Sequence, residues 1–448
     1  MSALTAHRIH FAFTITYHYL FPQLTMGLGL LLVVLKTLHL RGNEVAGEAA
    51  RFWSRIFGVT FVMGVVTGIP MEFQLGASWS RFSSATGGVI GHALAMEGVF
   101  AFFLESAFIY LMLYGEKRVS PRMHWGATLM VFLGSWLSGY FIIVTNAFMH
   151  HPVGHAVDPD GSVRLVSIGA FLTNPWALVE YAHTMVGSCI TASFVMAAVG
   201  AFYTLQRRHP PHAALFLRVG VTGGLLFALL AAAPTGDLQM RAVVEHQPAT
   251  FAAMEGHFHT EDGAALVLVG QPNEHTLTLD NPIAVPHFLS LMTHQRWHAR
   301  VRGLTEFDRS TWPDNVPLLY YGYHLMVGLG TIFVAVMGAA ALLLWRRRLS
   351  RTRAALWVLM LAAPLPFVAN TAGWMTTELG RQPWLVYGLM RTADGVSPKV
   401  SSGNALFTLL GYMGLYVILS MAFFFVVTRI LAEGPSVEPT REPEPEHA

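Results

Sequence analysis

The sequence is poor in cysteine and in charge. Cys189 is the only cysteine among 448 residues, and Lys, Arg, Asp and Glu make up 12% of the chain, about half the share of a soluble domain. A single cysteine excludes a disulfide within the chain, a CxxCH haem attachment and a cluster held by several cysteines. No basic patch with interleaved aromatic residues indicates a nucleic-acid partner. With 53% hydrophobic residues, the composition indicates a polytopic membrane protein.

Long apolar runs divide the chain into candidate membrane helices, each about 20 residues or more. The runs lie near residues 9–38, 52–76, 92–114, 125–148, 178–205, 216–235, 318–345, 354–378 and 404–431. They predict an all-α fold in which residues 1–235 form transmembrane helices one to six and residues 318–431 form helices seven to nine. A polar segment, 236–317, separates these groups, and a Pro/Glu-rich tail, 432–448, is expected to be disordered. The first run is too long for a removed signal peptide, so we expect it to remain as helix one.

Basic residues set the expected orientation of the helices. The connections after helices one, three, five and seven carry fourteen Lys and Arg residues, whereas those after helices two, four and eight carry five. The positive-inside rule therefore places the first set in the cytoplasm. The N-terminus and the 236–317 segment are then expected outside, in the periplasm, and the C-terminus inside.

Four residues inside the predicted helices are potential ligands of haem iron. His18, His183, Met326 and Glu378 all fall in the outer half of the bilayer when depth is counted at about 1.5 Å per residue. A His/Met pair such as His183 and Met326 suits a low-spin haem, and His18 and Glu378 could each supply one ligand to a further haem. The alternative is that the histidines are hydrogen-bonded core residues and Met326 is packing.

Other ionisable residues in the helices indicate a path for protons or a set of buried polar contacts. Glu97 and Glu105 are eight residues apart in the third run, roughly 12 Å along a helix. Ser138 in the fourth run reaches a middle depth similar to that of Glu105. Carboxylates stepped along a helix can relay protons, or each can be neutral and hydrogen-bonded to a neighbouring helix. His150 and His151 precede Pro152 at a helix end and are expected to be interface residues.

The most unusual block of the sequence is 373–384, at the end of the eighth run. It contains Trp374, Glu378, Arg381 and Trp384. An ionisable group in hydrocarbon is costly, so a functional role for Glu378 is favoured. The alternative is a helix end whose charges and indoles lie in the membrane interface.

These motifs closely resemble subunit I of the cytochrome bd-type quinol oxidases over residues 5–430. The matching segments are 17–21, 71–74, 97–98, 102–106, 134–138, 144–146, 183–184, 252–256 and 373–384. The run Gly380-Arg381-Gln382-Pro383-Trp384 is nearly a signature by itself. The short 236–317 segment, with Gln247-Pro248-Ala249, looks most like the cyanide-insensitive oxidase branch.

The resemblance implies a terminal oxidase of the bacterial inner membrane. Such an enzyme oxidises quinol on the outer side and reduces dioxygen to water with cytoplasmic protons, so that a proton motive force arises without pumping. It implies a periplasmic quinol-binding loop at 236–317, a second large subunit (subunit II) and a small single-span subunit.

The resemblance also implies three haems and a role for each matching residue. His183 and Met326 match the ligands of the low-spin haem b. His18 and Glu378 match the ligands of a high-spin haem b and a haem d, or a second high-spin haem b in its place. Glu97, Glu105 and Ser138 match the proton route of the family. Arg381 and Trp374 match residues beside the high-spin haems, and Glu255 matches the quinol site.

Two positions depart from the family pattern. Thr250 stands where the family often has a lysine, which puts a lysine-assisted quinol site in doubt. His324 stands where it often has an arginine, and we hypothesise a lower potential for the low-spin haem.

From the residues alone, an ion-coupled transporter with Glu97, Glu105 and Glu378 as proton-binding groups, or a membrane scaffold, is the alternative class. A reduced-minus-oxidised visible spectrum distinguishes these from an oxidase.

Overall fold

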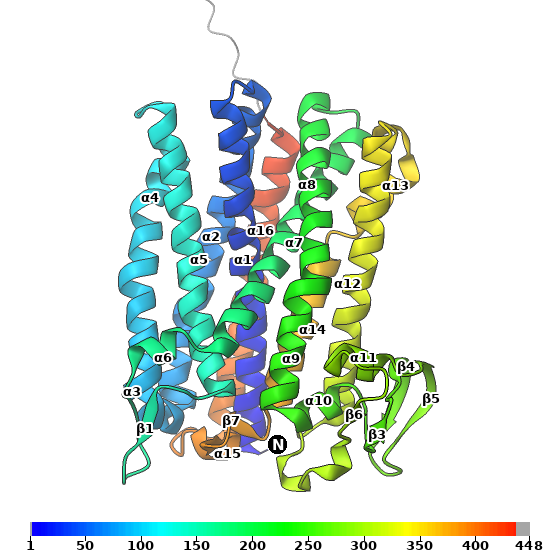
Figure 1. The fold of residues 1–448 in the computed structure, drawn as a ribbon. Helices are drawn as coiled ribbons and strands as arrows, with labels where there is room; N and C mark the ends of the chain where they lie inside the picture. Colours follow the sequence, from blue (N-terminus) through cyan, green and yellow to red (C-terminus); the bar gives the residue numbers. More distant parts are fainter. Residues whose placement is uncertain (1, 436–448) are drawn as a thin grey trace, which may run out of the picture.

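The computed structural model describes residues 2–435 and is a bundle of long helices (Figure 1). Within those residues, 9 helical spans are long and apolar enough to cross a membrane, which confirms the expected all-α membrane fold. The last helix ends at Glu433, so residues 432 and 433 are helical and not part of a tail. The rest of the predicted tail, from 436 onwards, lies outside the described residues.

Several spans consist of more than one helical segment. The spans are α1 (Ala3–Leu40), α2 (Glu44–Ser78), α3 with η1 and α4 (Ser80–Met96, Glu97–Phe102, Phe103–Tyr114), α5 (Pro121–His150), α6 and α7 (Ile168–Leu172, Pro175–Leu205), α8 with η2 and α9 (Pro210–Leu230, Ala231–Thr235, Gly236–His246), α12 (Val316–Trp345), α13 and α14 (Arg353–Leu361, Leu365–Arg381) and α16 (Ser402–Glu433). The two segments η1 and η2 are π-helical turns, a form that is frequent at functional sites.

Helix starts follow ordinary capping chemistry. The side chains of Asn43, Ser120 and Asn174 accept hydrogen bonds from backbone N–H groups in the first turns of α2, α5 and α7. Such caps satisfy N–H groups that have no partner within the helix. The sixth span extends past 235 to His246, further than its apolar run predicts, because the amphipathic residues of α9 continue the helix after hydropathy falls.

Short sheets and helices connect the spans. They are β1 (His155–Val157), β2 (Val163–Leu165), α10 (Pro248–Met254), β3 (Glu261–Asp262), β4 (Leu266–Asn273), β5 (Thr278–Val285), α11 (Phe288–His294), β6 (Arg300–Val301), η3 (Leu304–Glu306), η4 (Arg309–Thr311), η5 (Leu349–Arg351), β7 (Trp384–Val386), β8 (Met390–Arg391) and α15 (Thr392–Gly395). Within the described residues, the strands form four antiparallel pairs, β1 with β2, β3 with β6, β4 with β5 and β7 with β8. The polar segment between α9 and α12 lies at the same end of the bundle as the N-terminus, β1 and β7 (Figure 1).

Glycines allow the spans to approach closely. A Cβ at Gly200 of α7 would lie 2.8 Å from the backbone nitrogen of Leu217, and a Cβ at Gly220 of α8 would lie 2.5 Å from that of Ala197. Small residues at such crossings are typical of membrane helix pairs. At these two glycines, the backbones of α7 and α8 are therefore in direct contact.

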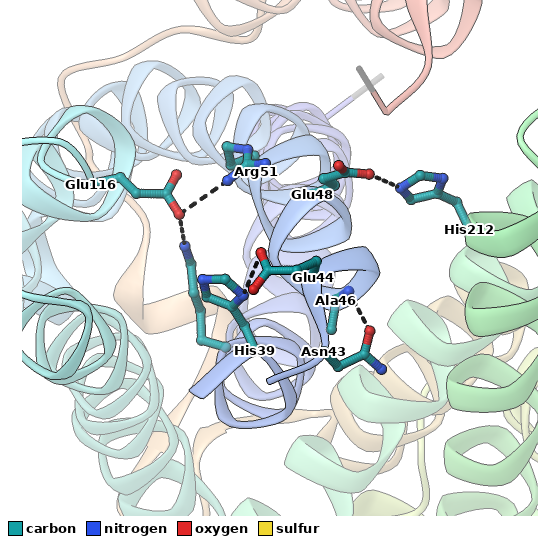
Figure 2. A network of polar contacts seen from close by, with 9 residues as sticks. His39, Asn43, Glu44, Ala46, Glu48, Arg51, Glu116 and His212 are labelled. Atoms are coloured by element: carbon teal, nitrogen blue, oxygen red, sulfur yellow. Dashed lines mark hydrogen bonds and ion pairs between the residues drawn. The ribbon is translucent and has the colours of Figure 1, made fainter. Parts of the chain in front are cut away.

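A polar network ties the opposite end of the bundle together (Figure 2). Glu116, between α4 and α5, accepts hydrogen bonds from Lys36 of α1 at 2.9 Å and Arg51 of α2 at 3.4 Å. His212 of α8 pairs with Glu48 of α2 at 2.8 Å. Burial acts to raise the pKa of Glu116, but the two cations outweigh burial and lower it. The connections at this end are the arginine-rich ones.

Candidate functional site

His18 presents one ring nitrogen as a potential ligand. Its Nδ1 lies 3.0 Å from the Thr67 hydroxyl, which itself donates to the Met63 carbonyl at 2.7 Å. Because the Thr67 proton is used there, His18 Nδ1 must be the donor, which leaves the Nε2 lone pair free. A hydrogen bond of this kind on the remote nitrogen is the usual support of a metal-binding histidine. A Cβ at Gly68 would lie 3.0 Å from His18 Cε1, so the glycine makes room for the ring.

His183 is held by the same arrangement in another part of the bundle. Its Nδ1 lies 3.1 Å from the Thr235 hydroxyl in η2, and this hydroxyl donates to the Leu230 carbonyl at 3.0 Å. His183 Nδ1 is therefore the donor and Nε2 is left with its lone pair. Two histidines on different helices are thus both prepared to bind iron through Nε2, which fits a haem protein.

Met326 lies against a glycine of the unusual block. A Cβ at Gly373 would be 2.7 Å from Met326 Sδ, so only glycine lets the thioether take this position. Met326 belongs to α12, which packs against α14, and α14 also contacts α7, the helix of His183. The thioether and the imidazole thus come from helices that share α14 as a neighbour.

Glu378 is a carboxylate held from two sides. It accepts a hydrogen bond from Asn146 Nδ2 at 2.7 Å and forms an ion pair with Arg381. Arg381 is nearly covered, with 2% of its side chain exposed, whereas 38% of the Glu378 side chain is not covered by protein atoms. Trp374, one turn earlier, lies 6.5 Å from the Tyr19 ring, next to His18 in sequence. The part of the Glu378 carboxylate that no protein atom covers can accept a further ligand.

The predicted proton-route residues form two serine–carboxylate pairs. Ser138 of α5 donates to Glu97 at 2.7 Å, and Ser135 donates to the buried Glu105. Ser138 and Glu97 were both predicted as proton-route residues. Ser135 was not predicted, although it lies three residues before Ser138 and within a matching motif. A Cβ at Gly134 would lie 3.0 Å from the Glu105 nitrogen, so the glycine lets α4 and α5 approach closely.

Glu255 is the buried carboxyl of the polar segment. It lies at the end of α10 with 2% exposure, and within residues 2–435 neither carboxyl oxygen has a hydrogen bond of good geometry. Burial raises its pKa to about 7, although the nearby Tyr323 hydroxyl favours the ionised form. A group with this pKa can exchange protons near neutral pH.

The two departures from the family pattern have structural explanations. Thr250 donates to the Gly380 carbonyl at 2.7 Å, and a Cβ at Gly380 would meet its methyl group, so a small residue fits between α10 and α14. His324 stacks on the Tyr320 ring at 3.8 Å, and its nitrogens lie 2.9 Å and 3.0 Å from the carbonyls of Tyr320 and Val267. His324 of α12 thus links this helix to β4 through its contact with the Val267 carbonyl.

Sequence reasoning missed a buried polar group beside Glu378. His150, which was expected at the interface, is only 2% exposed and stacks on Trp176. Glu180, one turn before His183, is 4% exposed and interacts electrostatically with Glu378 and Arg381. The one available signal was a carboxylate three residues before a candidate ligand histidine on the same helix.

The chain is similar to known proteins over nearly its whole length. A family model for cytochrome bd terminal oxidase subunit I matches residues 6–435. Cytochrome bd ubiquinol oxidase subunit 1 of Bacillus subtilis (strain 168) is 34% identical, with 97% of this chain and 94% of that protein covered. Cytochrome bd-II ubiquinol oxidase subunit 1 of Escherichia coli (strain K12) is 28% identical, with 97% and 98% covered. The solved structure of bd oxidase from Geobacillus thermodenitrificans gives a TM-score of 0.90 at 28% identity, with 97% of this chain and 99% of that chain covered.

Proposed function

The chain belongs to the cytochrome bd oxidase subunit I family and is thus a subunit of a terminal quinol oxidase. This family implies haem cofactors, and we propose that His18, His183, Met326 and Glu378 hold the haems. The observation that carries the proposal is the repeated threonine contact, which leaves Nε2 of both histidines free. Imidazole nitrogen and thioether sulfur are common ligands of haem iron, and the Glu378 carboxylate is the oxygen ligand that the family resemblance implies.

The four residues divide between a low-spin site and high-spin sites. His183 and Met326 would hold the low-spin haem b, since two strong protein ligands suit electron transfer. His18 and Glu378 would each hold one of the high-spin pair, a haem b and a haem d or a second haem b. When bound, these haems supply the electron transfer from quinol to dioxygen. Trp374 would lie beside this pair, and Arg381 holds the Glu378 carboxylate through its ion pair.

Quinol oxidation is assigned to the polar segment between α9 and α12. Glu255 is buried there with a pKa of about 7, so its carboxylate can accept a proton from a quinol hydroxyl and release it to solvent. Thr250 adds no charge to this site, and it supports the site through its contact with Gly380.

Protons for oxygen reduction would arrive through the two serine–carboxylate pairs. Glu97 begins the π-helical segment η1 and Glu105 lies in α4 of the same span, and each carboxyl has a hydroxyl donor that can orient it. A proton taken up at Glu105 would pass to Glu97 and then towards the high-spin haems. Taking protons from the cytoplasm and releasing quinol protons outside separates charge without a pump.

The orientation and the partners complete the proposal. The basic connections at the Glu116 end face the cytoplasm, and the N-terminus and polar segment face the periplasm of an inner membrane. Membership of the family implies a subunit II, and we propose a small single-span subunit as well.

Visible spectra of single variants of the assembled oxidase test the ligand assignment. We expect His183→Ala to lose the low-spin haem signal and His18→Ala to change a high-spin signal. His124→Ala is the matched control, because His124 is also buried but bonds the Met112 carbonyl through Nε2 at 3.0 Å. Wild-type spectra from both ligand variants would refute the assignment.

A further inference from the structure

Several buried polar atoms beside Glu378 lack a hydrogen-bond partner of good geometry among the described residues. They are Asn146 Oδ1, His150 Nε2, Trp176 Nε1, Glu180 Oε1 and Oε2, and Arg381 Nε. Among them, the Trp176 indole N–H still interacts with the Glu180 carboxyl one turn further along α7, so that pair needs fewer additional partners than the other atoms. Buried polar groups are normally hydrogen-bonded, and a group without a partner needs an explanation. A concentration of such atoms in one place indicates a bound polar species.

These side chains face one another across the ends of α5, α7 and α14. The His150 and Trp176 rings stack at 5.1 Å and an interplanar angle of 7°. Glu180 follows Trp176 by one turn of α7 and interacts electrostatically with Glu378 and Arg381, as does His150. Asn146 uses its amide group to bond Glu378, which leaves its carbonyl oxygen without a partner.

The chemistry of the unpartnered atoms identifies what they bind. Trp176 Nε1 and Arg381 Nε can only donate hydrogen bonds, whereas Asn146 Oδ1 can only accept them. An anion would satisfy the donors but would leave the Asn146 oxygen unpaired and lie against the Glu180 carboxyl. A cation would satisfy the oxygens but would be repelled by Arg381. Water both donates and accepts, and it is the usual partner of such buried groups.

We propose that Glu180, His150, Trp176 and Asn146 form a water-holding site beside Glu378, through which water formed in oxygen reduction leaves towards the outer surface. Gln247, the first residue after α9, donates to the His150 carbonyl at 2.9 Å and contacts its Nδ1 at 3.2 Å. The site therefore connects Glu378 with the polar segment. This outward path is separate from the Glu97 and Glu105 pairs. The inference rests on the proposed role of Glu378 as a haem ligand.

Radiolytic labelling of the purified oxidase complex tests for the bound water. X-ray pulses produce hydroxyl radicals from water beside a side chain, and mass spectrometry measures oxidation of that side chain. Trp53 is the matched control, since it is 0% exposed against 1% for Trp176 and its indole nitrogen also has no hydrogen-bond partner in the part of the chain that the structure describes. Trp53, however, lies in an apolar cluster between Phe52 and Phe216. We expect Trp176 to be oxidised several-fold faster than Trp53, and equal slow rates would overturn the proposal.

Two variants examine the part of Glu180. Glu180→Leu removes the carboxyl and should bring Trp176 labelling close to that of Trp53, whereas Glu180→Gln keeps polar atoms and should retain the labelling. Unchanged labelling in Glu180→Leu would remove Glu180 from the site. If Glu180→Leu does not assemble, the wild-type comparison of the two tryptophans still decides. Haem content measured on the same samples separates the outcomes, because fast Trp176 labelling without haem would contradict the proposed function and not the water site.

Discussion

Replacing Gly373 by alanine should displace the proposed Met326 ligand. The added Cβ would lie 2.7 Å from Met326 Sδ, whereas heavy atoms in contact favour about 3.5–4.0 Å, so one of the two groups must move by about 1 Å. Overpacking of this kind costs about 1–3 kcal/mol. If that free energy opposes the ligating position of Met326, its occupancy should fall by a factor of about 5 to about 150.

The assay is the reduced low-spin haem absorbance per assembled complex. Gly328→Ala is the control, because Gly328 lies on the same helix as Met326 and a Cβ there would meet nothing within 4 Å. We expect Gly373→Ala to lose most of the low-spin signal while the high-spin signals remain, and Gly328→Ala to match the wild type. A full low-spin signal in Gly373→Ala would refute the position assigned to Met326.

Substitutions at three further positions test the proton route, the quinol segment and the Thr250 departure. Glu105→Ala should slow oxygen reduction by about 10²-fold with haem content intact, measured by oxygen consumption and visible spectrum, and loss of all haem would make Glu105 structural. Burial raises the pKa of Glu255 from 4.5 to about 7, so between these pH values the unfolded chain loses a proton that the folded protein keeps, and stability falls as pH rises. Glu255→Gln should therefore stabilise the complex by up to about 3 kcal/mol near pH 8 and by little near pH 4. Equal shifts in the thermal unfolding temperature at both pH values would contradict the raised pKa of Glu255. Thr250→Lys should lower the Tm because the contact with Gly380 leaves no room for a longer side chain, whereas Thr250→Ser should keep the hydrogen bond, and an unchanged Tm for the lysine variant would show that the contact does not matter.

Hydropathy was sufficient to predict the spans of this fold. Nine apolar runs match the 9 spans found between residues 2 and 435 because backbone groups in hydrocarbon must be satisfied within a helix. The ends were less predictable, since α9 continues as a helix to His246 after its apolar character is lost. The hairpin β4–β5 was not visible as a separate element within the polar segment.

The candidate ligands could be identified from the sequence, but their supporting contacts could not. His18 is held by a threonine 49 residues away, and His183 by one 52 residues away. Nothing local to either histidine indicates those partners, because they depend on how α1 meets α2 and how η2 meets α7. The cluster around Glu180 was missed for the same reason, since its members come from three helices.

The number and type of haems in the purified complex test the central proposal most directly. A pyridine haemochrome spectrum reports haem content independently of activity. We expect three haems per copy of this chain, of which at least two are haem b and the third is haem d or a further haem b. A complex that contains the chain in full amount but no haem would contradict the assignment of His18, His183, Met326 and Glu378.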